Sequence, residues 1–65
     1  MIEESLTVIL PYIQNIEKIK NFIEENKDEN IKIIIEKIDV IIKNSDGTTT
    51  TDFKILKNEL EKRKN

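Results

Sequence analysis

The sequence contains no cysteine, histidine or tryptophan, and it has one proline, one glycine and three aromatic residues. Without cysteine there is no disulfide and no thiolate nucleophile, and without histidine the commonest zinc ligand and general base is missing. No apolar run approaches the ~20 residues that a membrane-spanning helix needs, and no secretory signal pattern opens the sequence. We therefore expect a cytoplasmic protein that has no metal, cofactor or catalytic residue and does not contact a membrane.

Acidic and basic residues are both abundant, with 13 Asp and Glu against 11 Lys and Arg and a net charge of −2. A nucleic-acid-binding module is usually strongly basic, so this balance argues against a direct nucleic-acid partner. The 65 residues make one small helical domain, residues 1–65. Because a core of this size is marginal without a disulfide or metal, we expect its extra stability to come from association, from unusually good helix packing or from a partner.

The most apolar segment, residues 31–42, has the sequence IKIIIEKIDVII. With 3.6 residues per turn, most of its isoleucines form one stripe, whereas the alternation expected of a β-strand changes phase across Glu36 and Lys37. We therefore favour a helix over residues 29–43, capped by Asp28, with a strand as the alternative. The stripe consists of Ile31, Ile34, Ile35, Ile38, Ile41 and Ile42.

Two apolar residues of this segment, Ile33 and Val40, are seven apart and lie opposite the main stripe. A helix that is apolar on two sides is usually covered on both. In so short a chain, the second cover is expected to be another copy of the same protein, with two isolated surface aliphatic residues as the alternative. We predict a homodimer or higher oligomer whose interface contains Ile2, Ile9, Ile33 and Val40.

Residues 2–26 follow a heptad-like apolar pattern that Pro11 interrupts. Proline either kinks one helix or separates two, and both alternatives remain open, with a short strand at residues 7–10 as a third. Asn26, in a left-handed conformation, is expected to end this segment, and the short polar link that follows predicts an antiparallel hairpin with helix 29–43.

A third helix is expected at residues 51–63, with Phe53, Leu56 and Leu60 on its apolar stripe. The other two aromatic residues, Tyr12 and Phe22, also lie on or beside apolar stripes, so we expect them in the core. The predicted fold is all-α: an antiparallel helical hairpin plus a third C-terminal helix, assembling as a homo-oligomeric bundle.

The turn at residues 44–52 is the most unusual polar segment. Gly47 allows positive φ, and Thr49 with Asp52 has the spacing of a capping box, with aspartate in place of glutamate. Hydroxyls and free N–H groups at a helix N-terminus suit an anion, with a plain turn and cap as the alternative. The predicted ligand-binding residues are Ser45, Asp46, Gly47, Thr48, Thr49, Thr50 and Lys54.

The sequence KNSDGTT, beginning at Lys43 and followed by apolar Phe53, Leu56 and Leu60, resembles the C-terminal part of the AbbA-type antirepressor. The similar segment, residues 43–60, covers about a quarter of the chain. The resemblance implies a dimeric helical protein that binds a transcription regulator on its DNA-contacting surface. It implies no partner-binding residues for this chain.

We predict a small non-enzymatic interaction protein, an oligomeric inhibitor or regulator of the phage, plasmid or regulon type, such as a phage anti-defence protein. It would bind a larger host protein through the third helix or through exposed residues of the first. The alternative is an oligomeric sequestering protein, or sponge, for an anionic nucleotide-like signal bound near residues 45–52. The candidate binding residues of the first helix are Glu17, Lys18, Asn21, Glu24 and Glu25.

Overall fold

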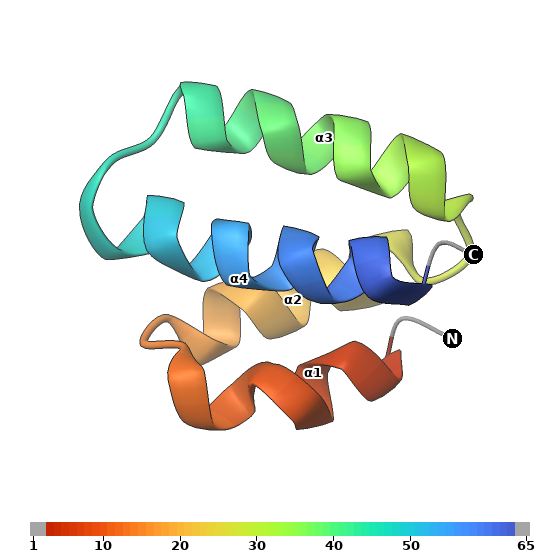
Figure 1. The fold of residues 1–65 in the computed structure, drawn as a ribbon, viewed down its shortest axis with the longest axis horizontal. Helices are drawn as coiled ribbons and strands as arrows, with labels where there is room; N and C mark the ends of the chain where they lie inside the picture. The colour runs from red at the N-terminus through yellow and green to blue at the C-terminus, as the bar shows by residue number, and fades with distance from the viewer. Residues whose placement is uncertain (1–2, 64–65) are drawn as a thin grey trace.

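The computed structural model describes residues 3–63, which form helices joined by short links (Figure 1). The predicted all-α class is confirmed, and neither residues 7–10 nor residues 31–42 form a strand. Four α-helices replace the three that were predicted. They are α1 (Glu3–Ile9), α2 (Ile16–Asn26), α3 (Ile31–Lys43) and α4 (Gly47–Arg63), with the 3₁₀ turn η1 (Leu10–Tyr12) after α1.

Pro11 lies at the start of η1, where its missing N–H is tolerated, and it separates α1 from α2. The chain becomes extended at Ile13 (φ −108°, ψ 154°) before α2 begins. Ile13 is buried, whereas Ile16, three residues further on, is 43% exposed. The heptad-like pattern therefore does not run along one helix, and the open choice at Pro11 is settled in favour of two helices.

α3 begins at Ile31 because Asn30, and not Asp28, is its N-cap. The Asn30 Oδ1 atom accepts a hydrogen bond from the backbone N–H of Lys32 at 2.8 Å. Towards the core α3 buries Ile34, Ile35 and Ile38, while Ile33 and Val40 remain 42% and 59% exposed. The prediction that these two residues lie on a separate outer face is confirmed.

α4 begins at Gly47, four residues earlier than predicted, and Gly47 has the expected positive φ of 64°. Thr49 and Asp52 both lie inside this helix, so the predicted capping box is wrong. A helix start at Gly47 leaves the Asp52 side chain free to contact another part of the chain.

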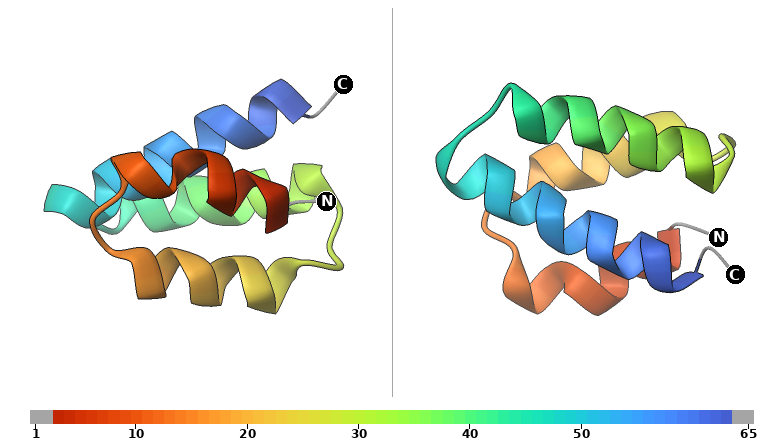
Figure 2. Two further views of the ribbon diagram at one scale, coloured as in Figure 1. Left: turned by 90° about the horizontal axis from the view of Figure 1, so that it is seen from below. Right: turned by 45° about the horizontal axis from the view of Figure 1, so that its top comes forward.

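The chain reverses direction at each link between helices, and α4 lies between α3 and α1 (Figures 1 and 2). The most extensive helix contacts are those of α4 with α3 and then with α1. The predicted hairpin of the first helix with residues 29–43 is therefore not the principal contact of the fold. The buried apolar core consists of Ile9, Ile13, Ile19, Ile23, Ile34, Ile35, Ile38, Phe53, Leu56 and Leu60.

Two of the three aromatic residues contribute to this core. The rings of Phe22 and Phe53 pack edge to face with centroids 5.3 Å apart and planes at 89°. Tyr12 is 71% exposed, so its predicted core position is wrong. It ends the 3₁₀ turn after Pro11, where the chain leaves α1, and its ring is directed away from the core.

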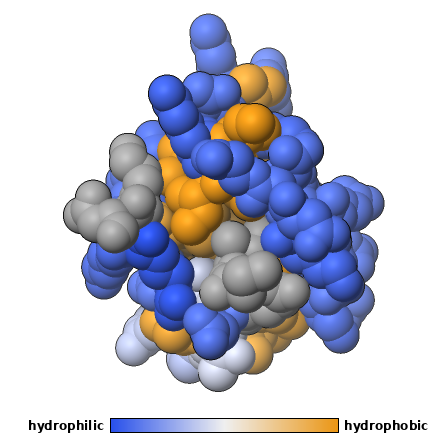
Figure 3. Space-filling view, turned by 90° about the vertical axis from the view of Figure 1, so that its right-hand side faces the viewer, coloured by the Kyte–Doolittle hydropathy of each residue, from blue (hydrophilic) through white to orange (hydrophobic). Residues whose placement is uncertain are grey.

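The surface mixes charged and apolar side chains. Figure 3 shows apolar surface (orange) gathered among hydrophilic side chains (blue) on one end of the molecule. No helix within residues 3–63 combines the length and the apolar character that crossing a bilayer requires.

Truncation of a side chain should lower stability much more on the inner face of α3 than on its outer face. Ile38→Ala should lower the free energy of unfolding by about 2–5 kcal/mol, because Ile38 is fully buried and its removal leaves a cavity. Val40→Ala, on the exposed face of the same helix, should change it by less than about 0.5 kcal/mol in dilute, monomeric protein. Urea unfolding followed by circular dichroism measures both, and equal losses would contradict the assignment of an inner and an outer face.

Candidate functional site

A buried carboxylate joins α4 to the link between α1 and α2. Asp52 is 1% exposed. The backbone N–H of Gln14 donates to Asp52 Oδ1 at 3.1 Å and Oδ2 at 3.2 Å. The backbone N–H and the side-chain Nδ2 of Asn15 both donate to Oδ2, at 2.7 Å and 2.8 Å. Asp52 therefore satisfies three donors that lie 37 or 38 residues away in the sequence.

Two opposing effects act on the pKa of Asp52. Burial raises this pKa because it disfavours the charged carboxylate, while the hydrogen bonds from Asn15 and Gln14 lower it because they stabilise the charged form. The hydrogen bonds prevail, and the pKa of Asp52 lies below its ordinary value of 3.8. Asp52 is therefore ionised at neutral pH.

The carboxylate takes the place of a local helix cap. Asn15 is the N-cap residue of α2, but its own side chain accepts no hydrogen bond from that helix. Asp52 of α4 accepts from the N-cap N–H instead, and its negative charge faces the positive end of the α2 dipole. The N-terminus of α2 is thus held on the first turns of α4.

Two threonines of α4 extend this contact. Asn15 Nδ2 also donates to Thr48 Oγ1 at 3.1 Å, and Lys18 Nζ donates to Thr49 Oγ1 at 3.5 Å. We call the contacts of Asn15, Lys18, Thr48, Thr49 and Asp52, together with Gln14, the α2–α4 clasp.

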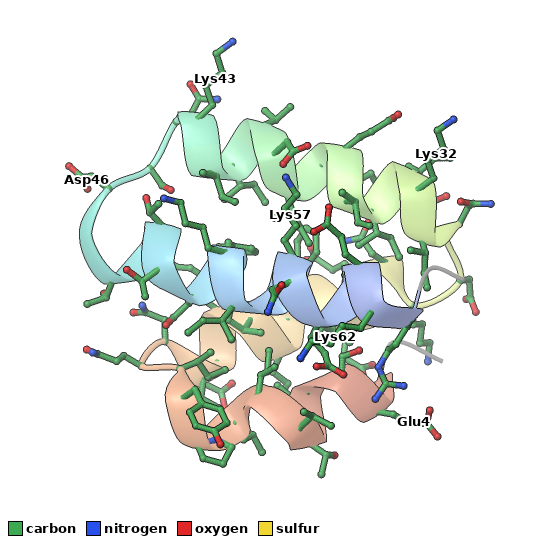
Figure 4. All side chains as sticks on the ribbon, viewed as in Figure 1. Glu4, Lys32, Lys43, Asp46, Lys57 and Lys62 are labelled. Carbon is green, nitrogen blue, oxygen red and sulfur yellow. The ribbon has the colours of Figure 1, made fainter. Side chains whose placement is uncertain are left out.

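The predicted ligand-binding residues lie together at the N-terminus of α4, but their hydroxyls bond within the chain. Thr48 and Thr49 belong to the α2–α4 clasp, and the hydroxyls of Ser45 and Thr50 are 2.8 Å apart. Asp46 is exposed in the link before α4 and is directed away from the helices (Figure 4). Gly47 begins α4, and Lys54 is exposed two turns further along this helix.

Lys57 of α4 forms an ion pair with α3. Lys57 rises from α4 towards α3 (Figure 4), where its Nζ lies 2.6 Å from Asp39 Oδ1. This hydrogen bond raises the pKa of the Lys57 ammonium and ties α4 to α3. Lys43, at the end of α3, is directed away from the bundle. Neither Lys43 nor Lys57 is therefore directed towards residues 45–50.

A second polar contact joins α2 to α3. Asn26, the last residue of α2, is 5% exposed. Its Nδ2 donates to the carbonyl oxygen of Phe22 at 2.8 Å, and its Oδ1 accepts from Lys37 Nζ at 2.7 Å. Lys37 also lies 3.7 Å from Glu29. Within residues 3–63 no residue other than glycine has positive φ, so the predicted left-handed Asn26 is wrong.

An open groove of about 660 Å³ lies along α2 between these two polar contacts. Its apolar side chains are Phe22 of α2, Ile41 of α3 and Phe53 of α4, and two glutamates stand on its α2 side. A second hollow of about 510 Å³ shares part of this lining and continues to Lys37 and Val40. We call the first hollow the α2 groove; it is lined by Glu17, Lys18, Asn21, Phe22, Glu25, Ile41, Thr49 and Phe53.

Four of the five candidate binding residues predicted on the first helix line the α2 groove: Glu17, Lys18, Asn21 and Glu25. Glu24 is exposed but is not part of that lining.

The predicted interface residues divide into three groups. Ile33 and Val40 are exposed on the outer face of α3, where a second copy can reach them. Ile9 is 3% exposed and packs in the core of its own chain, so its predicted interface position is wrong. Ile2 lies outside the described residues.

Among residues 3–63, no three acidic side chains gather closely enough to hold a metal ion.

The sequence pattern did not reveal the α2–α4 clasp or the apolar part of the groove. The Asp52 contact links residues almost 40 positions apart, and its local spacing with Thr49 indicated a different partner. The sequence did offer one signal: Asp52 lies next to Phe53 and four residues before Leu56, on the side of the apolar stripe. A charge on that side is expected to be buried, and a buried charge requires hydrogen-bond donors.

The family model of the MJ1579 family matches residues 1–65, and the chain belongs to this family. No curated protein and no solved structure shows a significant match to the chain.

Replacing Asp52 tests the α2–α4 clasp. Asp52→Asn should lower the free energy of unfolding at pH 7 by about 2 kcal/mol, because the charged acceptor of three N–H donors is lost. The folded-state pKa is lowered, so the contribution of Asp52 is fully present above pH 3.8 and is lost as the pH falls below that value. Urea unfolding from pH 7 to pH 3 should therefore show the two proteins converging in acid.

Asp46→Asn is the matched control, because Asp46 is exposed in the link before α4. Its stability should stay within about 0.5 kcal/mol of the wild type at every pH. Equal stabilities of the Asp52 and Asp46 variants at pH 7 would show that the buried carboxylate does not hold α2 in place.

Proposed function

We propose that this chain is a non-enzymatic, cytoplasmic interaction protein that self-associates and inhibits or regulates a larger protein by binding it in the α2 groove. The observation that carries this proposal is the groove itself. It offers an apolar surface made by three helices, with carboxylates beside it. Sites that bind a helix or loop of a partner commonly combine an apolar groove with polar residues at the margin.

The charge of the groove indicates what the partner presents. Glu17 and Glu25 contribute negative charge, while Lys18 is hydrogen-bonded to Thr49 on the opposite side. A segment with one or two large apolar side chains, flanked by lysine or arginine, would complement this surface. The apolar side chains would anchor the segment and the charges would set its orientation.

The resemblance of residues 43–60 to the AbbA-type antirepressor supports the inhibitor class. These residues form the end of α3, the link and most of α4, and they include Thr49 and Phe53 of the α2 groove. A transcription regulator that presents a cationic, DNA-contacting segment would match the acidic side of the groove.

The alternative is a sponge for an anionic nucleotide-like molecule at residues 45–50 and Lys54. The N-terminus of α4 supports an anion there. The intrachain hydrogen bonds of Ser45, Thr48, Thr49 and Thr50 favour a structural role for the same hydroxyls. A thermal-shift screen with cyclic and linear nucleotides separates the two functions, since only a sponge gains stability from them.

Charge reversal in the groove tests the proposed binding site. Glu25→Arg should abolish or weaken at least tenfold the capture of a partner, because it places a cation where we expect the partner's own cations. Glu24→Arg makes the same chemical change one residue earlier on α2, outside the groove lining, and should bind normally. Affinity capture from a host lysate, followed by titration of the captured protein, measures the difference.

A protein that binds wild type, Glu24→Arg and Glu25→Arg equally would contradict the groove as the site. Binding that is lost in both variants would indicate a general effect of charge on α2.

The proposed self-association depends on the outer face of α3. Ile33→Glu should convert a wild-type dimer or higher oligomer to monomer, because it places a carboxylate in an apolar interface. Its helical content should be unchanged, since Ile33 is 42% exposed in the single chain. Sedimentation equilibrium at 10–500 μM, a range of about fifty-fold that spans weak association, measures the mass. A wild type that remains monomeric throughout would refute self-association.

A further inference from the structure

The outer face of α3 has two chemically different sides. Lys37 bonds to Asn26 of α2, so one side of the face is directed towards α2. Asp39 pairs with Lys57, so the other side is directed towards α4. Glu36 precedes Lys37 by 100° around the helix and therefore lies on the α4 side. Ile33 and Val40 run between the two sides.

Among residues 3–63, no other helix lies beyond this face (Figure 1). Lys32 and Lys43 project from its two ends, away from the bundle (Figure 4). By the same helical angles, both lie on the side of Glu36. The face thus has a central apolar row, a negative charge with flanking lysines on its α4 side, and Lys37 on its α2 side.

The orientation of a second copy decides which charges meet. Two α3 helices can pack antiparallel about a twofold axis, with Ile33 against Val40. The α4 side of one copy then meets the α4 side of the other, and the two α2 sides also meet. Glu36 then faces Glu36, Lys37 faces Lys37, and Lys32 approaches Lys43 of the other copy. All of these contacts are repulsive, and like charges across an interface disfavour that arrangement.

If the two helices pack parallel and in register, the α4 side of one meets the α2 side of the other. Glu36 of each copy then faces Lys37 of the other, and this attractive pair occurs twice. Ile33 packs against Ile33 and Val40 against Val40. Within parallel coiled coils, β-branched residues at one heptad position favour two strands.

We propose that two copies of this chain dimerise through the outer faces of α3, parallel and in register, with Ile33 and Val40 as apolar layers and Glu36–Lys37 pairs beside them. This inference rests on the proposed self-association and adds its geometry. Lys37 and Val40 line the second hollow, which shares Phe22, Glu25 and Ile41 with the α2 groove, so the groove of each copy lies near the interface. A helix of 13 residues is only about 20 Å long, so the interface is small and the dimer weak.

The absence of native cysteine makes disulfide cross-linking a direct test. The full-length variants Ile33→Cys and Val40→Cys are each oxidised at a concentration where wild type sediments as a dimer. In the parallel pair each residue faces its own counterpart, within reach of a disulfide. Each single variant should therefore form a covalent dimer. Glu24→Cys, exposed on α2, is the control and should remain mostly monomeric.

In an antiparallel pair Ile33 lies about 10 Å along the axis from its counterpart, too far for a disulfide. Cross-linking of the double variant, with none in either single variant, would therefore overturn the parallel pairing. A wild-type dimer in which neither position cross-links would overturn the inference and leave self-association standing. A monomer at all concentrations would refute both.

Glu36→Lys gives an independent measurement. It replaces both attractive pairs with like-charge pairs and should raise the dimer Kd about tenfold in the parallel arrangement. In the antiparallel arrangement it exchanges one repulsion for another and leaves Kd nearly unchanged, which would contradict the proposal.

Discussion

A single buried carboxylate holds this small fold in its observed arrangement. Asp52 gives up hydration, which is costly for a charge, and three N–H donors of Gln14 and Asn15 compensate for that loss. Because the donors lie at the N-terminus of α2 and the acceptor lies in α4, the contact connects two segments that are 37 or 38 residues apart in the sequence. The apolar core can pack helices against one another in several ways, whereas this polar contact specifies one of them.

The surfaces that we associate with function follow from that arrangement. The clasp positions α2 so that Phe22 meets Phe53 of α4 edge to face, and the open groove lies beside these rings. α4 covers the inner stripe of α3, which leaves Ile33 and Val40 on the outside. One side of the molecule thus offers a groove with carboxylates, and an adjacent face offers an apolar row. A small binding protein that also pairs with itself needs two surfaces of this kind.

The features that the sequence predicted are those that depend on local periodicity. The helical class and the outward placement of Ile33 and Val40 follow from spacings of three, four and seven residues, and the structure confirms them. The contact of Asp52 with Asn15 could not be read in this way, because no short-range pattern encodes a pairing across 37 residues. The start of α4 was misplaced for a related reason. The spacing of threonine and aspartate resembled a local cap, while Gly47 with its positive φ begins the helix instead.

Amide hydrogen exchange at Asn15 tests the role of the clasp most directly. This N–H lies in the link before α2, outside the regular hydrogen bonds of any helix, and its acceptor is Asp52 at 2.7 Å. If the clasp holds the fold together, the Asn15 amide should exchange as slowly as the core amides of α4, through global unfolding. Exchange at the rate of an unprotected peptide, while the α4 amides stay protected, would show that α2 is positioned without Asp52.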